Sequence, residues 1–546
     1  MSTVTPTSPA VPTTISNLAP IPQPIGNSDV VAVVQNGTTY KATAVQLAFP
    51  NNIVLPVSQG GTGNSTGNLS ALNATATGAT TSRTLAAYFS DVINVLDFGA
   101  VGNGVADDTV AIKAAVAAAN AAGGGIVLFS KENYLYTSST ATIVGQGVTL
   151  MGTNPYGSVI TTNNAGANIF NLNGAGASCV SLGFASSVAN TSGIFILISG
   201  IENYVSDFHI SGDYVGIQIT GVATKVSDGW FGAGASGAKR IIILCGDASP
   251  KLHNILYEAQ SPQICAAGLS LQSCTALTAT QLDIIQQGNC LEIIPGNGQL
   301  CLDNKFIGCF FDSGNTPALI EPTGTGAIAR TTFDACWTGD SATTSAGLEV
   351  VQSGSSVIEG LTLIGHEASV NTTGPNAGIS LNGVITGVNI IGGTFAQNTG
   401  AGIYAGHTGD ITIIGAKIGA YDGFPGNTTY GIDLGANLTS VIIQGCSFIG
   451  NTSGAISDGV PNTVPKFINN NIIPSYAKAG TISVGSSPFT YTAPYDQTVY
   501  TTAGTVSGIV VGSTTLFAAT GNSVTLRQGE SMVVTYSSIP TMTYTA

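Results

Sequence analysis

Short apolar strands that each end at a small residue recur through the middle of the chain, between residues 143 and 476. Their ends align at six positions: Gly308, Ala335, Gly365, Gly392, Gly415 and Gly445. The intervals between these positions are 27, 30, 27, 23 and 30 residues. A period of this size indicates supersecondary units that stack, each burying its apolar side chains against the next. Loops of unequal length between short strands account for the uneven spacing.

A second sequence pattern recurs at similar intervals. Gly-Ile pairs begin at Gly378, Gly402 and Gly431, at intervals of 24 and 29 residues. Leucine-rich repeats have a similar period, but they need a fixed ladder of Leu and Asn that this sequence does not show. We therefore predict an all-β protein whose body is a right-handed parallel β-helix, a solenoid of single strands.

Residues 92–120 are typical of the opening of such a solenoid. An apolar strand at residues 93–98 leads into a glycine-rich turn and then into Asp107 and Asp108. Apolar residues follow at helical spacing from Val110 to Val116, and a run of three glycines ends the segment. We expect a short helix that covers the open end of the core, with Asp107 and Asp108 capping it rather than acting as catalytic acids.

The composition favours strands and turns over helices. Gly supplies 71 of the 546 residues, and only 8% of the chain is charged. No run approaches the roughly 18 apolar residues that cross a bilayer, so we expect no membrane insertion. The first residues lack the basic and apolar regions of a Sec signal peptide, so synthesis in the cytoplasm is expected.

Charge and cysteine content exclude further classes. The net charge of −14 comes entirely from the middle of the chain, because residues 1–96 and 477–546 are each neutral. This distribution argues against a nucleic-acid partner. The nine cysteines form no CxxC pair, so we predict no metal site, cofactor or disulfide framework. Buried free thiols are expected instead, with Cys309, Cys336 and Cys446 stacked in the core.

Three blocks of the sequence resemble bacteriophage tail proteins. DFGAVGNGVADD, followed by the expected helix, resembles the N-terminal signature of the pectate-lyase-like and polygalacturonase-like superfamily, and especially of phage tailspikes. Near the N-terminus, SNLAPIPQPIGNSDVVAVVQNGTTYKAT and VSQGGTG resemble modules of tail fibres and spikes. The alternating strands after Lys478 resemble the C-terminal β domains of phage tail proteins.

The resemblance implies a domain order and a set of partners. Residues 1–90 would be a virion-attachment module with a linker, 91–142 the start of the β-helix with its capping helix, 143–476 the body, and 477–546 an antiparallel β-sandwich. Asn36-Gly37 predicts a hairpin in the first block. A homotrimer in the phage tail is implied, made in the host cytoplasm, bound to tail or baseplate proteins through residues 1–90 and to a host cell-surface polysaccharide.

The repeat alignment also points to a candidate site. Neighbouring residues of a strand face opposite ways, so if the stacked cysteines point inwards, the residues after them point outwards. The predicted outer column is Phe310, Trp337, Glu367, Thr394, Lys417 and Ser447. Asp312 and Asp340 lie just beyond it. Aromatic rings offer platforms for sugars and carboxylates serve as acid and base, so Phe310 and Trp337 are candidate substrate-binding residues, and Asp312, Asp340 and Glu367 are candidate catalytic residues.

Coil spacing bears on the chemistry. Coils stack about 4.8 Å apart, so Asp340 with Glu367 would suit a retaining glycosidase and Asp312 with Glu367 an inverting one. A polysaccharide lyase would need a basic residue near an acidic sugar, for which Lys239, Arg240 and Arg330 are candidates. The competing interpretation is that all of these are solvated surface residues. His366, in the inward column, is expected to be a satisfied core histidine.

The alternatives in function are therefore open. One is a tailspike or tail fibre that binds and depolymerises a host polysaccharide. The others are a purely adhesive, non-catalytic receptor-binding fibre and a free bacterial polysaccharide lyase or hydrolase.

Overall fold

The computed structural model describes residues 30–35, 38–43, 73–130, 132–246, 249–258, 264–343, 346–374, 376–469, 471, 479–494, 497–527 and 529–545. The chain divides into two units, Met1–Asp91 and Val92–Ala546. In the first unit, β1 (Val30–Gln35) pairs antiparallel with β2 (Thr38–Thr43), so the predicted hairpin is confirmed. The VSQGGTG motif lies outside the described residues.

The rest of the first unit is short. A two-stranded ladder of β3 (Asn73–Ala74) and β4 (Arg83–Thr84) precedes α2 (Leu85–Phe89). The Thr84 hydroxyl caps this helix by accepting a hydrogen bond from the backbone N–H of Ala87. The Arg83 guanidinium pairs with the Asp91 carboxylate over 2.8 Å on the surface.

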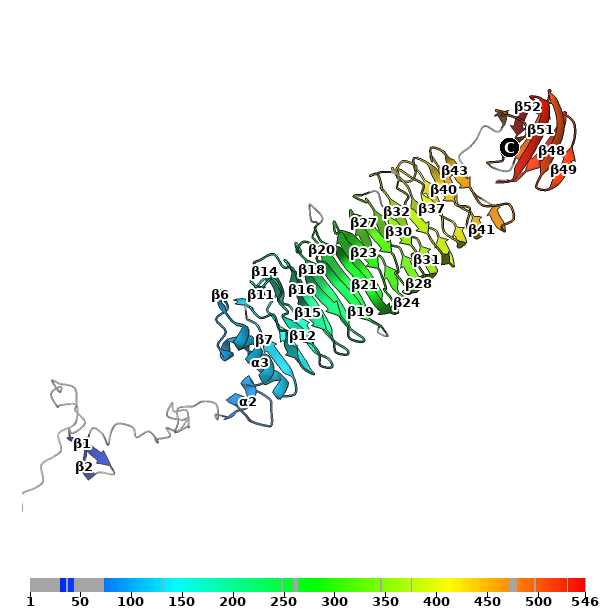
Figure 1. Ribbon diagram of the computed structural model, residues 1–546. Coiled ribbons are helices and arrows are strands. Elements are labelled where there is room, and N and C mark those ends of the chain that lie inside the picture. Colours follow the sequence, from blue (N-terminus) through cyan, green and yellow to red (C-terminus); the bar gives the residue numbers. More distant parts are fainter. Residues whose placement is uncertain are drawn as a thin grey trace, which may run out of the picture. The chain divides into compact units, whose positions relative to one another are not determined.

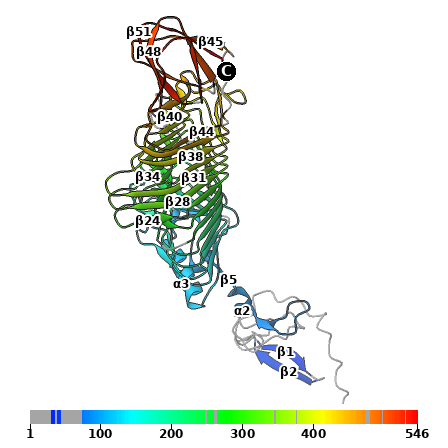
Figure 2. The ribbon, with the colours of Figure 1, turned by 90° about the vertical axis from the view of Figure 1, so that its right-hand side faces the viewer.

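The second unit is built on the predicted parallel β-helix, and each coil supplies strands to three sheets (Figures 1 and 2). Sheet A contains β5 (Val92–Asn94), β7 (Gly125–Leu128), β10 (Val148–Met151), β13 (Ser178–Val180), β16 (Tyr204–Ile210), β18 (Lys225–Phe231), β20 (Lys251–Tyr257), β22 (Thr278–Ile285), β25 (Lys305–Ile307), β28 (Ala327–Asp334), β31 (Val357–Ile364), β35 (Val388–Ile391), β38 (Gly409–Ile414), β41 (Leu438–Gln444) and β44 (Lys466–Asn469).

Sheet B continues from sheet A around a corner, and β16, β18, β20 and β22 run through both. Its other strands are β6 (Asn103–Asp107), β8 (Glu132–Leu135), β11 (Ser158–Thr162), β14 (Gly183–Ser186), β26 (Phe310–Asp312), β29 (Trp337–Gly339), β32 (Glu367–Ser369), β36 (Thr394–Phe395), β39 (Lys417–Gly419) and β42 (Ser447–Ile449).

Sheet C closes each coil. It contains β9 (Thr142–Val144), β12 (Phe170–Leu172), β15 (Ile194–Ile198), β17 (Val215–Ile219), β19 (Lys239–Cys245), β21 (Ala267–Thr275), β23 (Asn289–Ile293), β27 (Thr316–Ile320), β30 (Leu348–Val351), β33 (Ile379–Asn382), β37 (Ile403–Ala405), β40 (Tyr430–Leu434) and β43 (Gly454–Asp458). Two short strands, β24 (Leu300–Leu302) and β34 (Ile385–Thr386), lie between sheets C and A.

The corner from sheet A to sheet B explains the small residues of the repeat. Every one of the six aligned positions has a positive φ, between 49° at Ala335 and 68° at Gly415. This left-handed conformation is unstrained only for glycine, which is why glycine fills five of the six corners. In earlier coils Asp207, Asp228 and Asn254 take the same conformation.

A buried asparagine ladder holds the corner after sheet B. The Nδ2 of Asn371, Asn398 and Asn427 each donates to the Oδ1 of the next asparagine, the last being Asn451, over 2.8–2.9 Å. Asn398 and its neighbours Asn371 and Asn427 are fully buried. The intervals between the four asparagines are 27, 29 and 24 residues, whereas the corner glycines of the same coils are 27, 23 and 30 residues apart, so the glycine alignment did not reveal this ladder. The Oδ1 of Asn398, Asn427 and Asn451 also accepts a hydrogen bond from the backbone N–H of the preceding asparagine of the ladder, which keeps the coils in register.

The opening of the body differs in detail from the prediction. Helix α3 (Thr109–Ala121) buries Ile112, Ala115 and Val116 against the core, as expected, but Val110 is 78% exposed. Residues 95–98 form a short 3₁₀ turn rather than a strand.

The expected capping role of Asp108 is wrong. Its buried carboxylate accepts hydrogen bonds from the backbone N–H groups of Val101, Gly102 and Leu135, and so ties the entering turn to β8. Asp107 accepts from the first helical N–H, that of Thr109, over 3.0 Å. Asp107 therefore has the expected role at the start of the helix, whereas Asp108 is buried.

The C-terminal part consists of two four-stranded antiparallel sheets around a small apolar core, which confirms the predicted sandwich. One sheet contains β45 (Ala479–Ile482), β47 (Gln497–Thr502), β50 (Asn522–Leu526) and β52 (Thr541–Thr545). The other contains β46 (Phe489–Thr492), β48 (Thr505–Val511), β49 (Thr514–Phe517) and β51 (Ser531–Ser538). In the described part of the chain, no helix has the length and apolarity to cross a membrane.

All nine cysteines are buried and none forms a disulfide bond, as predicted. Cys309 and Cys336 follow successive corners, and Cys446 occupies the equivalent position in a later coil. Burial raises the pKa of the Cys290 thiol to about 12. We expect native protein to react with a thiol reagent at a small fraction of the rate of protein unfolded in guanidinium, which then exposes nine thiols. Rapid labelling of several thiols in the native protein would contradict this arrangement.

The asparagine ladder generates a second prediction. Asn398→Ala removes two side-chain hydrogen bonds within the ladder and leaves buried donors without partners, so unfolding free energy should fall by about 1–3 kcal/mol. Urea denaturation followed by circular dichroism measures the change. Asn462→Ala, at an exposed position, is the matched control and should leave the midpoint unchanged. An equal response of the two variants would show that the ladder contributes nothing.

Candidate functional site

The predicted outer column exists in the structure. Strand pairing joins Phe310 to Trp337 and Trp337 to Glu367 on successive coils of sheet B. Thr394, Lys417 and Ser447 continue the same line. Phe310 is 52% exposed, and Trp337 and Glu367 are half-buried. The residues chosen from the repeat alignment therefore share one outer face.

This column extends further towards the N-terminus than the sequence analysis found. Pairing places Asp283 beside Phe310, and Leu256, Trp230 and His209 on the three coils before it. Both tryptophans of the chain thus stand in one line, with Trp230 42% exposed. The alignment missed these coils because their corner residue is Asp, Asn or Gln rather than glycine. An acidic or amide residue two positions before each outward residue is the signal that could have revealed them.

Two of the predicted acids are joined by one hydroxyl. The Ser313 Oγ lies 3.2 Å from Asp312 Oδ2 and 3.0 Å from Asp340 Oδ2. These two carboxylate oxygens are therefore no more than about 6 Å apart, close to the separation of the acid pair in retaining glycosidases. The Trp337 indole N–H donates to Asp312 Oδ1 over 3.2 Å and fixes the ring beside the carboxylate.

The environments of these two acids differ. Burial raises the pKa of Asp312, and the charge of Asp340 adds to the rise against the opposing hydrogen bonds from Trp337 and Ser313. Asp340 is exposed, at a left-handed corner with φ 51°. A half-buried carboxyl group with a raised pKa, such as that of Asp312, is suited to donate a proton.

Asp340 and Glu367 are not the neighbours that coil spacing suggested. The residue level with Glu367 is Trp337, whereas the backbone of Asp340 bonds to Ser369, at the following corner. Asp340 follows Trp337 by three residues, so it lies further along the coil than the level of Glu367. Asp340 therefore pairs with Asp312, and Glu367 stands apart from both.

Glu367 has its own surroundings. Burial raises its pKa, a hydrogen bond with Ser369 opposes this, and the charge of Asp422 adds to the rise. Two coils beyond, the Lys417 ammonium lies 3.7 Å from the centre of the Tyr421 ring. Asp422 and Tyr421 come from the loop after β39 and were not identified from the sequence, because loops break the repeat.

Asp283 is a further acid that the sequence analysis did not select. Burial raises its pKa, and the charge of Asp312 on the next coil raises it further. The column thus carries half-buried carboxyl groups at Asp283, Asp312 and Glu367. Such crowding of like charges beside exposed aromatic rings is typical of binding and catalytic sites.

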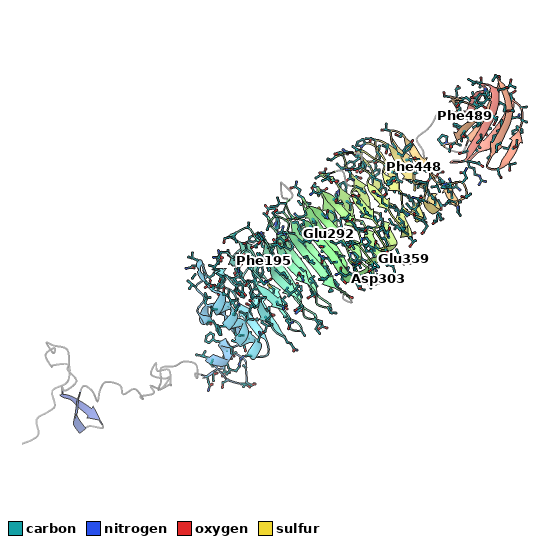
Figure 3. The ribbon with its side chains drawn as sticks, in the orientation of Figure 1. Phe195, Glu292, Asp303, Glu359, Phe448 and Phe489 are labelled. Atoms are coloured by element: carbon teal, nitrogen blue, oxygen red, sulfur yellow. The ribbon has the colours of Figure 1, made fainter. Side chains whose placement is uncertain are left out.

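The basic candidates for lyase chemistry lie elsewhere. Arg240 is fully buried and forms a two-point ion pair with Asp213, at 2.7 and 2.9 Å. Lys239 contacts Glu292 over 2.5 Å on sheet C, and Arg330 pairs with Asp303 at another edge of the body (Figure 3). Each cation is already paired with an acid outside the outer column, which weakens the lyase interpretation.

Only one of the two ring nitrogens of the inward-facing His366 has a hydrogen-bond partner among the described residues. His366 Nε2 lies 2.9 Å from the Thr338 hydroxyl, while its buried Nδ1 has no partner among the described residues. Burial lowers the pKa of His366 to about 3, so the ring is neutral. It packs against Phe333 and belongs to the core.

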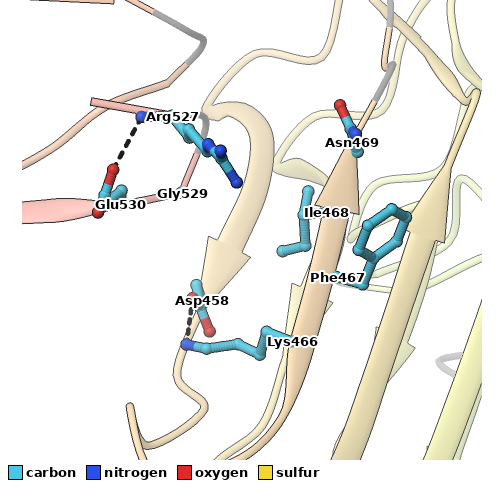
Figure 4. A pocket seen from close by; sticks show the side chains of 8 residues that line it. All are labelled: Asp458, Lys466, Phe467, Ile468, Asn469, Arg527, Gly529 and Glu530. Carbon is cyan, nitrogen blue, oxygen red and sulfur yellow. Dashed lines mark hydrogen bonds and ion pairs between the residues drawn. The ribbon is translucent and has the colours of Figure 1, made fainter. Parts of the chain in front are cut away.

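At the end of the body, a cavity of about 440 Å³ is lined by residues that include Asp458, Lys466 and Arg527. There Lys466 of β44 donates to Asp458 of β43 over 2.8 Å (Figure 4). This ion pair satisfies both charges, and none of the predicted residues is nearby. Among the described residues, no group of three or more His, Cys, Asp or Glu side chains is arranged to hold a metal ion.

Comparison with known proteins supports the fold. Residues 92–227 match a family model described as rhamnogalacturonase A/epimerase, pectate lyase-like. A tailspike protein of E. coli bacteriophage HK620, solved in complex with a pentasaccharide, superposes with a TM-score of 0.54 at 10% identity, over 87% of this chain and 97% of that one. The predicted resemblance to tailspikes with a pectate-lyase-like β-helix is thus confirmed for the fold.

A short stretch is also similar to an enzyme. It is 61% identical over 41 residues to the mannuronan C5-epimerase AlgE1 of Azotobacter vinelandii, which is 8% of this chain. The match spans only 3% of that epimerase. It therefore indicates a shared local motif rather than a shared activity.

The raised pKa of Asp312 makes a prediction about stability. A folded-state pKa above the unfolded value favours the protonated form, so its contribution is present at low pH and is lost as pH rises through the folded pKa. Asp312→Asn should then melt at pH 7 at a temperature about 1–2 °C higher than wild type, since half-exposure keeps the effect small. The difference should vanish near pH 3.

Asp303→Asn is the matched control, because the pKa of Asp303 is shifted in the opposite direction to that of Asp312. A hydrogen bond from Arg330 lowers the pKa of Asp303, so neutralising it should leave the melting temperature at pH 7 equal or lower. Scanning calorimetry between pH 3 and pH 7 measures both variants. A lower melting temperature of Asp312→Asn at pH 7 would refute the assignment of a destabilising charge.

Proposed function

We propose that this chain is a bacteriophage tailspike or tail fibre protein that binds a host cell-surface polysaccharide along the outer column of sheet B and hydrolyses it there. The observation that carries this proposal is the column itself. It aligns Trp230, Phe310 and Trp337 with the acids Asp283, Asp312 and Glu367 on one face. Aromatic rings and carboxylates on one face match the apolar faces and hydroxyl groups of a sugar chain.

The geometry of the column suits an extended ligand. Successive coils present one residue about every 4.8 Å, so a glycan running along the column meets a new side chain with each coil. Phe310 and Trp337 would stack on sugar rings, and Glu367 would accept hydroxyl hydrogen bonds. The excess of acids over Lys417 disfavours a polyanionic chain and favours a neutral one.

Asp312 and Asp340 would supply the chemistry. Asp312 donates its proton to the glycosidic oxygen as the bond from that oxygen to the anomeric carbon breaks, and Asp340 attacks the anomeric carbon to form a glycosyl ester. Asp312, now ionised, takes a proton from water, whose oxygen displaces Asp340 from the sugar. Ser313 holds the two carboxylates at the short separation that this double displacement requires.

The virion role is proposed from the tail-fibre-like motifs. Residues 1–90 would attach three copies of the chain to the phage tail or baseplate. Antibodies against this segment should label intact virions, as a free bacterial enzyme would not.

Cleavage can be tested on purified capsule and lipopolysaccharide from a panel of bacterial strains. We expect new reducing ends with at least one of them, and a loss of about 100-fold or more in Asp312→Asn and in Asp340→Asn. Asp303→Asn, outside the column, should keep full activity. Both inactive variants should still bind the polysaccharide.

The alternatives give different results. Binding of a polysaccharide without any release of reducing ends would identify the purely adhesive fibre. Release that is unaffected by the Asp312 and Asp340 substitutions would place the catalytic residues elsewhere. An unsaturated product, detected by its ultraviolet absorbance, would indicate a lyase.

A further inference from the structure

A groove lies on sheet C, separated from the outer column of sheet B by the loops of each coil. Its volume is about 340 Å³. Four outward residues on successive coils follow one another along it: Glu349, Ser380, Tyr404 and Asp433. None of them belongs to the proposed catalytic column.

Small residues shape the groove. Ala346, Ala377 and Ala401 occupy equivalent positions, each followed by a buried glycine that precedes a strand of sheet C, and all three line the groove. Alanine at each position leaves the space between the loops and the strand residues unfilled. The hollow therefore runs across several coils instead of being a local pit.

Tyr404 provides an aromatic platform within the groove. A Cβ added to Gly406 would lie 2.5 Å from the Tyr404 hydroxyl oxygen and 2.7 Å from its ring carbon Cζ. The Tyr404 ring thus packs along the chain over Gly406, which has no side chain, and the ring is half-exposed. A ring held flat in this way offers its face to a ligand, as sugar-binding tyrosines do.

An unmatched acceptor also lines the groove. Asn376 is only 3% exposed, and its Nδ2 donates to the carbonyls of Thr343 and Thr373 over 2.8 Å each. Its Oδ1 has no hydrogen-bond partner among the described residues. This oxygen is closed to solvent, and a buried amide oxygen without a donor is costly, so a small outward shift of the side chain on binding would let a ligand hydroxyl or amide N–H satisfy it.

We propose that this groove is a second, non-catalytic site for a neutral oligosaccharide rich in hydroxyl or N-acetyl groups. The Asn376 amide oxygen needs a donor, the carboxylates of Glu349 and Asp433 make the groove acidic, and no Lys or Arg is among the described residues that line it. Uronate-rich chains are therefore excluded by charge. The proposal shares only its ligand class with the proposed function. A second site on the same body would lengthen attachment through avidity.

The test uses the full-length protein on a printed array of bacterial surface glycans that includes neutral, N-acetylated and uronate-rich polysaccharides. Tyr404→Ala removes the platform, and Ser380→Tyr fills the groove from an outward position. Both should lower the retention of neutral or N-acetylated glycans about tenfold, while uronate-rich glycans should not be retained by any form. Tyr500→Ala, in the C-terminal sandwich, is the matched control and should bind as wild type does.

Trp337→Ala separates the two sites. If the groove binds glycan independently, the Trp337→Ala protein should keep part of its binding, and adding Tyr404→Ala should abolish the remainder. Unchanged binding in both Tyr404→Ala and Ser380→Tyr would overturn the groove proposal and leave the proposed function standing. Unchanged binding in Trp337→Ala with loss of binding in Tyr404→Ala would overturn the proposed function and leave the groove proposal standing. Retention of no glycan by the wild-type protein would overturn both.

Discussion

The structure depends on the parallel register in which each coil hydrogen-bonds to the next. This register places equivalent residues of successive coils one above another, so that any residue type repeated at the coil period becomes a ladder. Glycines make the corner ladder, asparagines such as Asn398 make the hydrogen-bonded one, and Cys309 and Cys336 stack in the core. A shift of one residue in any coil would turn its core side chains outwards and break all of these ladders together.

The same register brings carboxylates of the candidate site close enough to repel one another. Strand pairing places Asp283 level with Phe310, two residues before Asp312 on the next coil, and burial raises the pKa of both acids. Residues selected only for stability would not be placed so, since like charges on adjacent strands repel. The cost is tolerable because the large core and the asparagine ladder stabilise the coils on which these acids stand. Such local destabilisation is common where function needs a poised group.

The comparisons with known proteins support the fold, whereas the proposals on function rest on the sheet B column and the sheet C groove. A β-helix is a frame on which different chemistries are placed, so the likeness to a tailspike does not identify a site in this chain. The sheet B column and the sheet C groove differ in character. The column combines exposed aromatics with paired acids, whereas the groove has one flat tyrosine, small residues and an unmatched amide oxygen. The first suits cleavage and the second suits retention of a glycan.

Sequence reasoning was sufficient where the pattern is local. The strand ends at Gly308 to Gly445 predicted the coils, their corners and the alignment of Phe310, Trp337 and Glu367, because a left-handed corner selects for glycine and side chains alternate along a strand. Sequence reasoning failed where an outcome depends on which atoms meet across coils or loops. The role of Asp108, the pairing of Asp340 with Asp312 through Ser313, and the asparagine ladder are of this kind. By itself the sequence determined the fold and the alignment of Phe310, Trp337 and Glu367 on one face. Only the tertiary structure decided which acids lie close together, because loops of unequal length set the final positions of their side chains.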